Sequence, residues 1–128
     1  FSELAGPNAS RVHFIQTYVF GEQNSGKGDA VMAALKKRYP EIKTLADVTP
    51  AVGIANAYDG MHLVAKAIEN AGSVKGSEVR DGFYAIEQHD GLIKQYSQPF
   101  TADQHDALGP EDYLFTHFVD GQIVPLQP

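Results

Sequence analysis

Cysteine is absent from this 128-residue sequence, and basic residues are scarce. Without cysteine the chain forms no disulfide, no thiolate zinc site and no cysteine nucleophile. Ten lysines and arginines stand against sixteen acidic residues, which gives a net charge of −6. Nucleic-acid binding requires clustered basic side chains, and the cluster at residues 36–38 ends a predicted helix, where it complements the helix dipole. The composition therefore excludes disulfide-dependent folds and argues against a nucleic-acid partner.

Long apolar runs are missing too. No stretch approaches the roughly 18 apolar residues that a membrane-spanning helix needs. The hydrophobic content of 43% and the charged content of 20% are typical of a globular chain, and the length suits one domain or a piece of a larger one. Because the sequence begins at Phe1 without an initiator methionine, we expect either a removed signal peptide or a fragment. The features described next favour a fragment.

A glycine-rich stretch follows the first strand-like run. Gly21, Gly26 and Lys27 have the G-x-x-x-x-G-K spacing of a nucleotide-binding loop. The next residue of such a loop is a serine or threonine whose hydroxyl coordinates magnesium, but here it is Gly28. Such a site would also need an aspartate at the end of an apolar strand. The sequence has this arrangement only at Asp120, and the glycine that follows Asp120 indicates a hairpin turn instead. We interpret the stretch as a polar loop; magnesium-dependent ATP binding would revive the alternative of a nucleotide hydrolase.

The apolar pattern predicts one strand, three helices and then short strands. The expected elements are a strand at 12–20, helices at about 30–38, 49–72 and 77–88, and two hairpin-like turns after residue 92. Thr49 and Pro50 suit a helix cap and a first helical residue, and Ser77 is expected to cap the third helix. The second helix carries an apolar stripe of Ile54, Tyr58, Met61, Ala65 and Ile68. Since so few strands cannot form a sheet that covers three helices, we expect these faces to pack on something outside the chain.

Residues able to carry chemistry are scattered along the sequence. The five histidines show no metal-binding spacing; they are His13, His62, His89, His105 and His117. No G-x-S-x-G nucleophile motif occurs, and the carboxylates give no sign of a buried pair. The sequence therefore predicts no metal site, no cofactor and no catalytic residue, and the chain is not expected to be an enzyme.

Several short motifs in combination resemble a known family. They are AYDG in the second helix, AIENAGS at its end, VRDGF in the third helix and the closing DGQIVPL. The run GLIKQYSQPFTADQHDAL looks like a subgroup of branched-chain-amino-acid-type transporters. Together the motifs are similar to the C-terminal part of the type I periplasmic solute-binding proteins, relatives of the leucine/isoleucine/valine-binding protein that serve ATP-driven importers. The resemblance covers almost the whole chain.

This resemblance implies the fold class and the organisation of the chain. We expect an α/β fragment of a two-lobed type I periplasmic-binding-protein fold, rich in helices and with short strands. Residues 1–20 would be the end of lobe 2 and the first hinge strand. Residues 21–115 would be the C-terminal part of lobe 1, and residues 116–128 the hinge return and terminal hairpin. The missing sheet strands of lobe 1 would then cover the apolar helix faces.

The resemblance also implies four ligand-binding positions. Val52, Gly53 and Asn56 fall at the start of the long helix, where the family's cleft lies, and Tyr18 falls near the hinge. Plain packing is the alternative for Tyr18 and Val52. Glycine in a helix costs up to about 1 kcal/mol relative to alanine, so we hypothesise that Gly53 makes room for a solute bulkier than leucine, such as an aromatic acid. Close helix packing is the alternative for Gly53.

The function that the resemblance implies is solute capture in the periplasm. The solute would be an amino acid or a similar small carboxylate, aromatic acids included, and the partner would be the membrane permease of an importer. A ligand-sensing regulatory domain of the same fold is the alternative. An export signal in the gene would favour transport, whereas a fused signalling domain would favour sensing. A fragment of this kind is expected to self-associate or to pair with its missing N-terminal portion.

Overall fold

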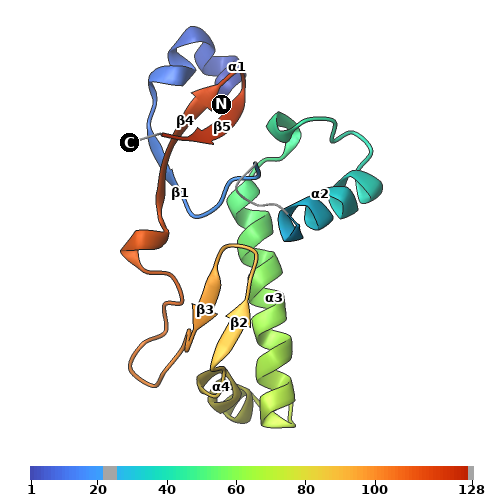
Figure 1. The fold of residues 1–128 in the computed structure, drawn as a ribbon, viewed down its shortest axis with the longest axis vertical. Helices are drawn as coiled ribbons and strands as arrows, with labels where there is room; N and C mark the ends of the chain where they lie inside the picture. Colours follow the sequence, from blue (N-terminus) through green and yellow to red (C-terminus); the bar gives the residue numbers. More distant parts are fainter. Residues whose placement is uncertain (22–25, 127–128) are drawn as a thin grey trace. The chain divides into compact units, whose positions relative to one another are not determined.

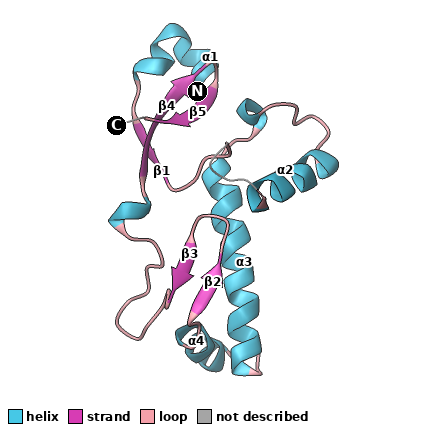
Figure 2. Cartoon of the chain, in the orientation of Figure 1, coloured by secondary structure: helices cyan, strands magenta, loops and turns pink. Residues whose placement is uncertain are grey.

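The computed structural model of the chain describes residues 1–21 and 26–126 (Figures 1 and 2). It divides into two compact units, Phe1–Val52 with Asp112–Pro128 (unit 1) and Gly53–Glu111 (unit 2). Most elements of unit 1 are short: α1 (Ser2–Ala5), η1 (Gly6–Arg11), β1 (Phe14–Gln16), α2 (Lys27–Arg38), η3 (Leu45–Asp47), β4 (Leu114–Val119) and β5 (Gln122–Pro125). Unit 2 is dominated by a long helix: α3 (Ala51–Ala71), α4 (Gly76–Tyr84), β2 (Gln88–Asp90), β3 (Gln95–Ser97) and the η4 turn (Pro110–Asp112) at its end.

Unit 1 is built on a three-stranded antiparallel sheet in the order β1-β4-β5 (Figure 1). Phe14 of β1 pairs with Thr116 of β4, which is fully buried and whose hydroxyl donates a hydrogen bond of 2.9 Å to the carbonyl of Phe14. On the same face the ring of Phe118 lies 5.0 Å from that of Phe14 and 5.4 Å from that of Phe1. The N-terminal residues therefore cover one face of this sheet.

The turn between β4 and β5 confirms the hairpin prediction. Asp120 and Gly121 both have positive φ, 48° and 81°, as the two-residue turns that join right-twisted strands require. Asparagine, aspartate and glycine tolerate this backbone region best. Asp120 is thus a turn residue, and the terminal hairpin starts at Leu114, slightly earlier than expected.

The strand predicted at 12–20 is mostly not a strand. Only Phe14–Gln16 pairs with a neighbour in the described chain. Tyr18, Val19 and Phe20 are buried without forming a ladder. Strands prefer β-branched and aromatic residues because these side chains suit a half-buried surface, not because they cause pairing. The sequence pattern therefore located the buried segment correctly but predicted too long a strand.

The predicted helix starts are shifted by one to three residues. α3 begins at Ala51, after a cis Thr49–Pro50 peptide bond, so Pro50 precedes the helix instead of forming its first residue. α4 begins at Gly76 after Lys75, which places Ser77 inside the first turn and not at the cap. Capping residues in the sequence locate the start of a helix to within a few positions, and the packing of the folded chain determines which of these positions begins the helix. The predicted end of α3 is confirmed, because Gly72 follows it with φ of 58°.

The core of unit 2 forms where α3, α4 and the loop after β3 meet. Leu63, Ala67 and Ile86 are buried together, and Val79, Phe83 and Phe100 pack around them. Gly82 of α4 lies so close to α3 that an added Cβ would be 2.1 Å from the carbonyl oxygen of Ala67. Part of the helix surface is therefore covered within the chain itself, contrary to the expectation that cover must come from outside.

The buried face of α3 differs from the predicted stripe. Positions Ala55, Asp59, Leu63 and Ala67, four residues apart, are buried. Met61, predicted to lie in the stripe, is 69% exposed, and Ala65 is exposed as well. The helix carries apolar residues on two faces, so periodicity alone could not select the face that α4 and the β2–β3 hairpin cover.

Candidate functional site

The four predicted ligand positions lie in different environments. Tyr18 is only 3% exposed, and its ring packs edge-on against Phe20 with centroids 5.0 Å apart. Val52 is half-buried in the first turn of α3, whereas Gly53 and Asn56 are exposed. Val52 and Asn56 are four residues apart and so share one helix face. None of the four lines any of three cavities found in the described part of the chain.

The largest of these cavities lies within unit 1 and has a volume of about 610 Å³. It is enclosed by residues 19–21, the first turns of α2, Leu45 and strand β5. Small-molecule pockets have volumes of about 300–1,000 Å³. Sequence reasoning missed this cavity because its walls come from four segments that only the fold brings together. The buried run 18–20 was the one signal that pointed to it.

Asp29 is the one charged side chain among the described residues that line this cavity. It lies in the first turn of α2, where a negative charge is stabilised by the helix dipole. Its carboxylate accepts a hydrogen bond of 3.3 Å from the backbone N–H of Gly26. A phosphate at this helix end would meet that carboxylate, and buried Gly28 offers no magnesium ligand. The polar loop predicted for residues 21–28 is shorter than expected at its end, because Lys27 and Gly28 lie in the first turn of α2. Residues 22–25 of the stretch lie outside the described residues.

The cavity wall at Leu45 is part of the short helix η3, which the side chain of Asp47 caps. The carboxylate of Asp47 accepts hydrogen bonds from the backbone N–H groups of Thr44 (2.7 Å) and Lys43 (3.0 Å) and from the Thr44 hydroxyl (3.0 Å). These bonds, the one from the Thr44 N–H first, lower the pKa of Asp47. Because the folded pKa is depressed, the stabilisation is present above the unfolded pKa of about 3.9 and is lost as the pH falls through the folded value. The turn is therefore fully capped at neutral pH.

A buried carboxylate in unit 2 was missed by sequence reasoning. Asp59 is 2% exposed and accepts hydrogen bonds from the backbone N–H groups of Leu92 (2.5 Å) and Ile93 (2.9 Å) and from the Tyr96 hydroxyl (2.8 Å). Gly91 lies against it, because an added Cβ would be 2.7 Å from a carboxylate oxygen. These bonds attach the β2–β3 turn to α3, which gives Asp59 a structural role. Its four-residue spacing from Ala55 and Leu63 was the available signal.

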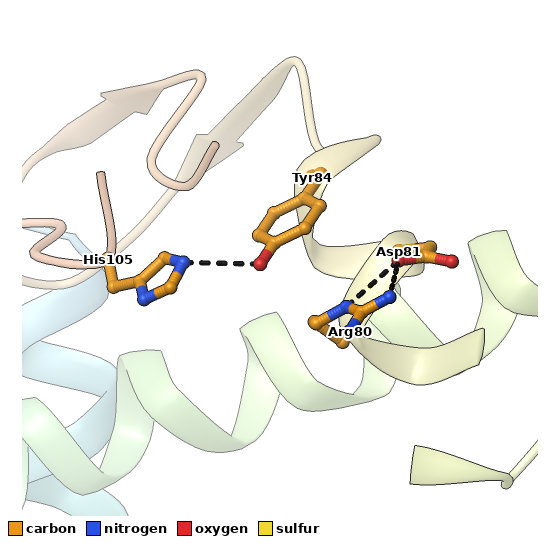
Figure 3. Close-up of polar contacts among 4 residues, drawn as sticks. All are labelled: Arg80, Asp81, Tyr84 and His105. Carbon is orange, nitrogen blue, oxygen red and sulfur yellow. Dashed lines mark hydrogen bonds and ion pairs between the residues drawn. The ribbon is translucent and has the colours of Figure 1, made fainter. Parts of the chain in front are cut away.

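A second polar cluster lies on the surface of unit 2 (Figure 3). The hydroxyl of Tyr84 lies 3.1 Å from Nε2 of His105, and the two rings stack with centroids 6.0 Å apart. Next to them Arg80 forms an ion pair of 2.8 Å with Asp81, which raises the pKa of Arg80. Exposed pairs of this kind contribute little to stability. None of the three cavities described for this chain includes the cluster, so we assign it no binding role.

The residues that the structure describes show neither a cluster of three metal ligands nor a membrane-spanning helix. They contain no group of three or more histidines or carboxylates placed to hold a metal ion. None of their helices is both long enough and apolar enough to cross a membrane.

Comparison with known proteins gives a match in structure but not in sequence. No protein-family model and no curated protein matches the chain. A type 1 periplasmic binding protein from Bordetella pertussis Tohama I superposes with a TM-score of 0.75 at 17% identity, over 98% of this chain and 36% of that one. The chain has the fold of part of a type 1 periplasmic binding protein. The predicted fold class is thereby confirmed.

A second solved structure agrees. The solute-binding protein of an ABC transporter from R. palustris, in complex with benzoate, superposes with a TM-score of 0.64 at 14% identity. The match covers 98% of this chain and 31% of that one. This chain therefore spans about a third of the length of the two proteins it resembles in fold.

Proposed function

We propose that the chain is part of the solute-binding component of an ATP-driven importer. The observation that supports this most is the agreement in fold along 98% of the chain with a periplasmic binding protein and with a transporter solute-binding protein. The component would work in the periplasm and deliver its solute to a membrane permease. We expect the component to bind its solute without chemical change, because the two proteins of the same fold are a periplasmic binding protein and a solute-binding protein.

Capture would proceed by closure of two lobes around the solute. Bound solute stabilises the closed state through contacts that the open state lacks. Residues 1–20 would belong to the end of lobe 2 and the first hinge strand, residues 21–115 to lobe 1, and residues 116–128 to the hinge return and terminal hairpin. In this assignment the start of α3 faces the cleft, and Tyr18 lies near the hinge.

The proposed solute is a small carboxylate, and aromatic acids are the class that we favour. The R. palustris protein of the same fold holds benzoate. In this chain Gly53 and Asn56 are exposed at the start of α3, so a solute could approach the helix at Gly53 and accept a hydrogen bond from the Asn56 amide. Val52 would supply apolar contact beside them. Tyr18 is the weakest member of the set, because its ring is already packed.

The test is a titration of Gly53→Phe in the complete protein that contains this chain. Calorimetry with benzoate, phenylalanine and leucine should show at least a tenfold loss of affinity for the aromatic acids, because the new ring fills the space they need. Gly76→Phe is the matched control, since Gly76 lies in the first turn of α4 and an added Cβ there meets open space. If Gly53→Phe binds all three acids as the parent does, the position does not line the pocket.

A further inference from the structure

Two histidines that are 104 positions apart in the sequence lie side by side on the sheet of unit 1. The register pairs Phe14 with Thr116 and Ile15 with Phe115, so one step back along the ladder brings His13 opposite His117. Cross-strand partners project from the same face of a sheet. The two imidazole rings are indeed neighbours, with centroids 6.2 Å apart and planes at 86°.

This separation suits two ligands of one metal ion. Ring nitrogens lie about 1 Å from the ring centre, so facing nitrogens at this spacing are roughly 4 Å apart. Two nitrogens bound to one tetrahedral ion at about 2.0–2.1 Å are roughly 3.3 Å apart, so the two rings must move slightly closer together. Rotation about χ2, a soft torsion for histidine, turns a nitrogen of each ring toward the other. The backbone register therefore places both ligands on one face of the sheet, and small side-chain adjustments complete the geometry.

Both imidazoles are accessible and uncommitted. His13 is exposed, and His117 is half-buried on the central strand. Among the described residues, no hydrogen bond or ion pair engages either ring, and their contact is with each other. The segments 12–20 and 113–125 contain no lysine or arginine, Arg11 lies two positions before His13, and the net charge of the chain is −6. A divalent cation would therefore meet a chain of net negative charge, with Arg11 as the one basic side chain next to these segments in the sequence.

We propose that His13 and His117 form a surface site for a transition-metal ion of the Zn²⁺, Ni²⁺ or Cu²⁺ class, with water completing the coordination. Imidazole nitrogen suits these ions, and Cu²⁺ and Ni²⁺ bind such ligands more tightly than Mn²⁺ or Fe²⁺. An ion held by β1 and β4 would cross-link the first and last parts of the chain. The proposed metal site shares no residue with the proposed solute positions and does not depend on the proposed function.

A second histidine pair provides an internal control. The rings of His62 on α3 and His89 on β2 stack 6.1 Å apart, almost the same distance. However, Nε2 of His89 is buried, and His62 also packs on Tyr58 with centroids 4.5 Å apart. His62 itself is exposed, so the difference lies in His89, whose buried ring nitrogen a metal ion could reach only if the surrounding contacts broke. Two neighbouring rings of which one is closed to solvent in this way should not give binding.

The experiment titrates the 128-residue chain with NiCl₂ and ZnCl₂ by calorimetry, beside His13→Gln, His117→Gln and His62→Gln. We expect one ion per chain in the parent and in His62→Gln. Each of the other variants should weaken binding by at least about tenfold, since loss even of a partner that only orients a ligand costs about 10–100-fold. Broadening of amide NMR signals by Cu²⁺ should be strongest around His13 and His117 and should spare α4 and the β2–β3 hairpin.

The use of both His13→Gln and His117→Gln separates loss of a metal ligand from loss of the fold. His13 is exposed and precedes β1, so His13→Gln keeps the fold intact even if His117→Gln disturbs the central strand, and circular dichroism checks both. Absence of saturable binding in the parent would overturn the proposal. So would an equal loss in His62→Gln, or binding that is unchanged in folded His13→Gln.

Discussion

At the residue scale, Asp59 shows how a charged side chain is accommodated in the interior of this small unit. An unpaired buried carboxylate would be costly, but here two backbone N–H groups and the Tyr96 hydroxyl satisfy it. Its donors lie more than 30 positions away in the chain. From the sequence it is one more scattered acid, because nothing local reveals which distant groups will meet it.

We predict that Asp59→Ala destabilises the chain by about 3 kcal/mol or more. Two buried N–H groups and a hydroxyl would lose their acceptor, and each such loss costs about 1–3 kcal/mol. Asp81→Ala is the control, because its exposed ion pair with Arg80 contributes about 0–1 kcal/mol. Urea unfolding followed by circular dichroism measures both changes. Similar midpoints for the two variants would show that the Asp59 network does not hold the hairpin on α3.

Other single residues were predictable to different degrees. The Asp120–Gly121 turn was found from the sequence because positive φ at two successive positions restricts the residue types strongly. The assignments of Pro50 as a first helical residue and of Ser77 as a cap were wrong by one and two positions. Many residue types can occupy the first turn of a helix, so the sequence specifies the start of a helix only weakly. A turn with positive φ accepts few residue types and is therefore specified strongly.

At the element scale, α3 carries two apolar faces with different neighbours. Leu63 and Ala67 contact α4 and Ile86 within unit 2. Met61 and Val64 are exposed on the other face. The length and end of the helix were predictable from the apolar pattern and from Gly72, but the choice of covered face depends on where α4 and the hairpin pack. That choice is a tertiary property.

We predict unequal effects for two substitutions on this helix. Leu63→Ala should destabilise the chain by about 2–5 kcal/mol, because it opens a cavity in the core of unit 2. Met61→Ala removes a side chain that is 69% exposed, and it should change stability by no more than about 0.5 kcal/mol. Thermal unfolding of the two variants at low concentration gives the comparison. A loss at Met61 equal to that at Leu63 would mean that the exposed face is covered in solution.

The candidate site also shows what a sequence can locate at this scale. Val52, Gly53 and Asn56 were grouped because they are neighbours on one helix. The cavity of unit 1 escaped notice because residues 19–21, Leu45 and β5 meet only in the folded chain. His13 and His117 were treated as unrelated for the same reason, since their pairing follows from the β1–β4 register. Long-range pairing of short strands is weakly specified by local pattern.

At the scale of the whole molecule, the chain corresponds to about a third of the proteins that share its fold. Large apolar side chains remain exposed along it, and two surfaces carry neighbouring pairs of them. One is the face of α3 with Met61 and Val64; the other is the open face of the β1–β4–β5 sheet, where Ile15 and Phe115 are 54% and 64% exposed. In a complete two-lobed protein, further strands and helices would be available to cover such surfaces.

We predict that the isolated 128-residue chain associates at micromolar concentration. Burial of a large apolar side chain contributes about 1.5–3 kcal/mol, and monomers rarely leave contiguous apolar patches larger than a few hundred Å² exposed. Self-association through the α3 face is the form that we favour, so Met61→Lys should shift the sedimentation coefficient toward that of the monomer. The retained N-terminal portion of the same protein, added in trans, should compete with the self-associated form. A compact monomer at every concentration, for parent and variant alike, would instead mean that the two units close their own cores, and the interpretation of the chain as a fragment would fail.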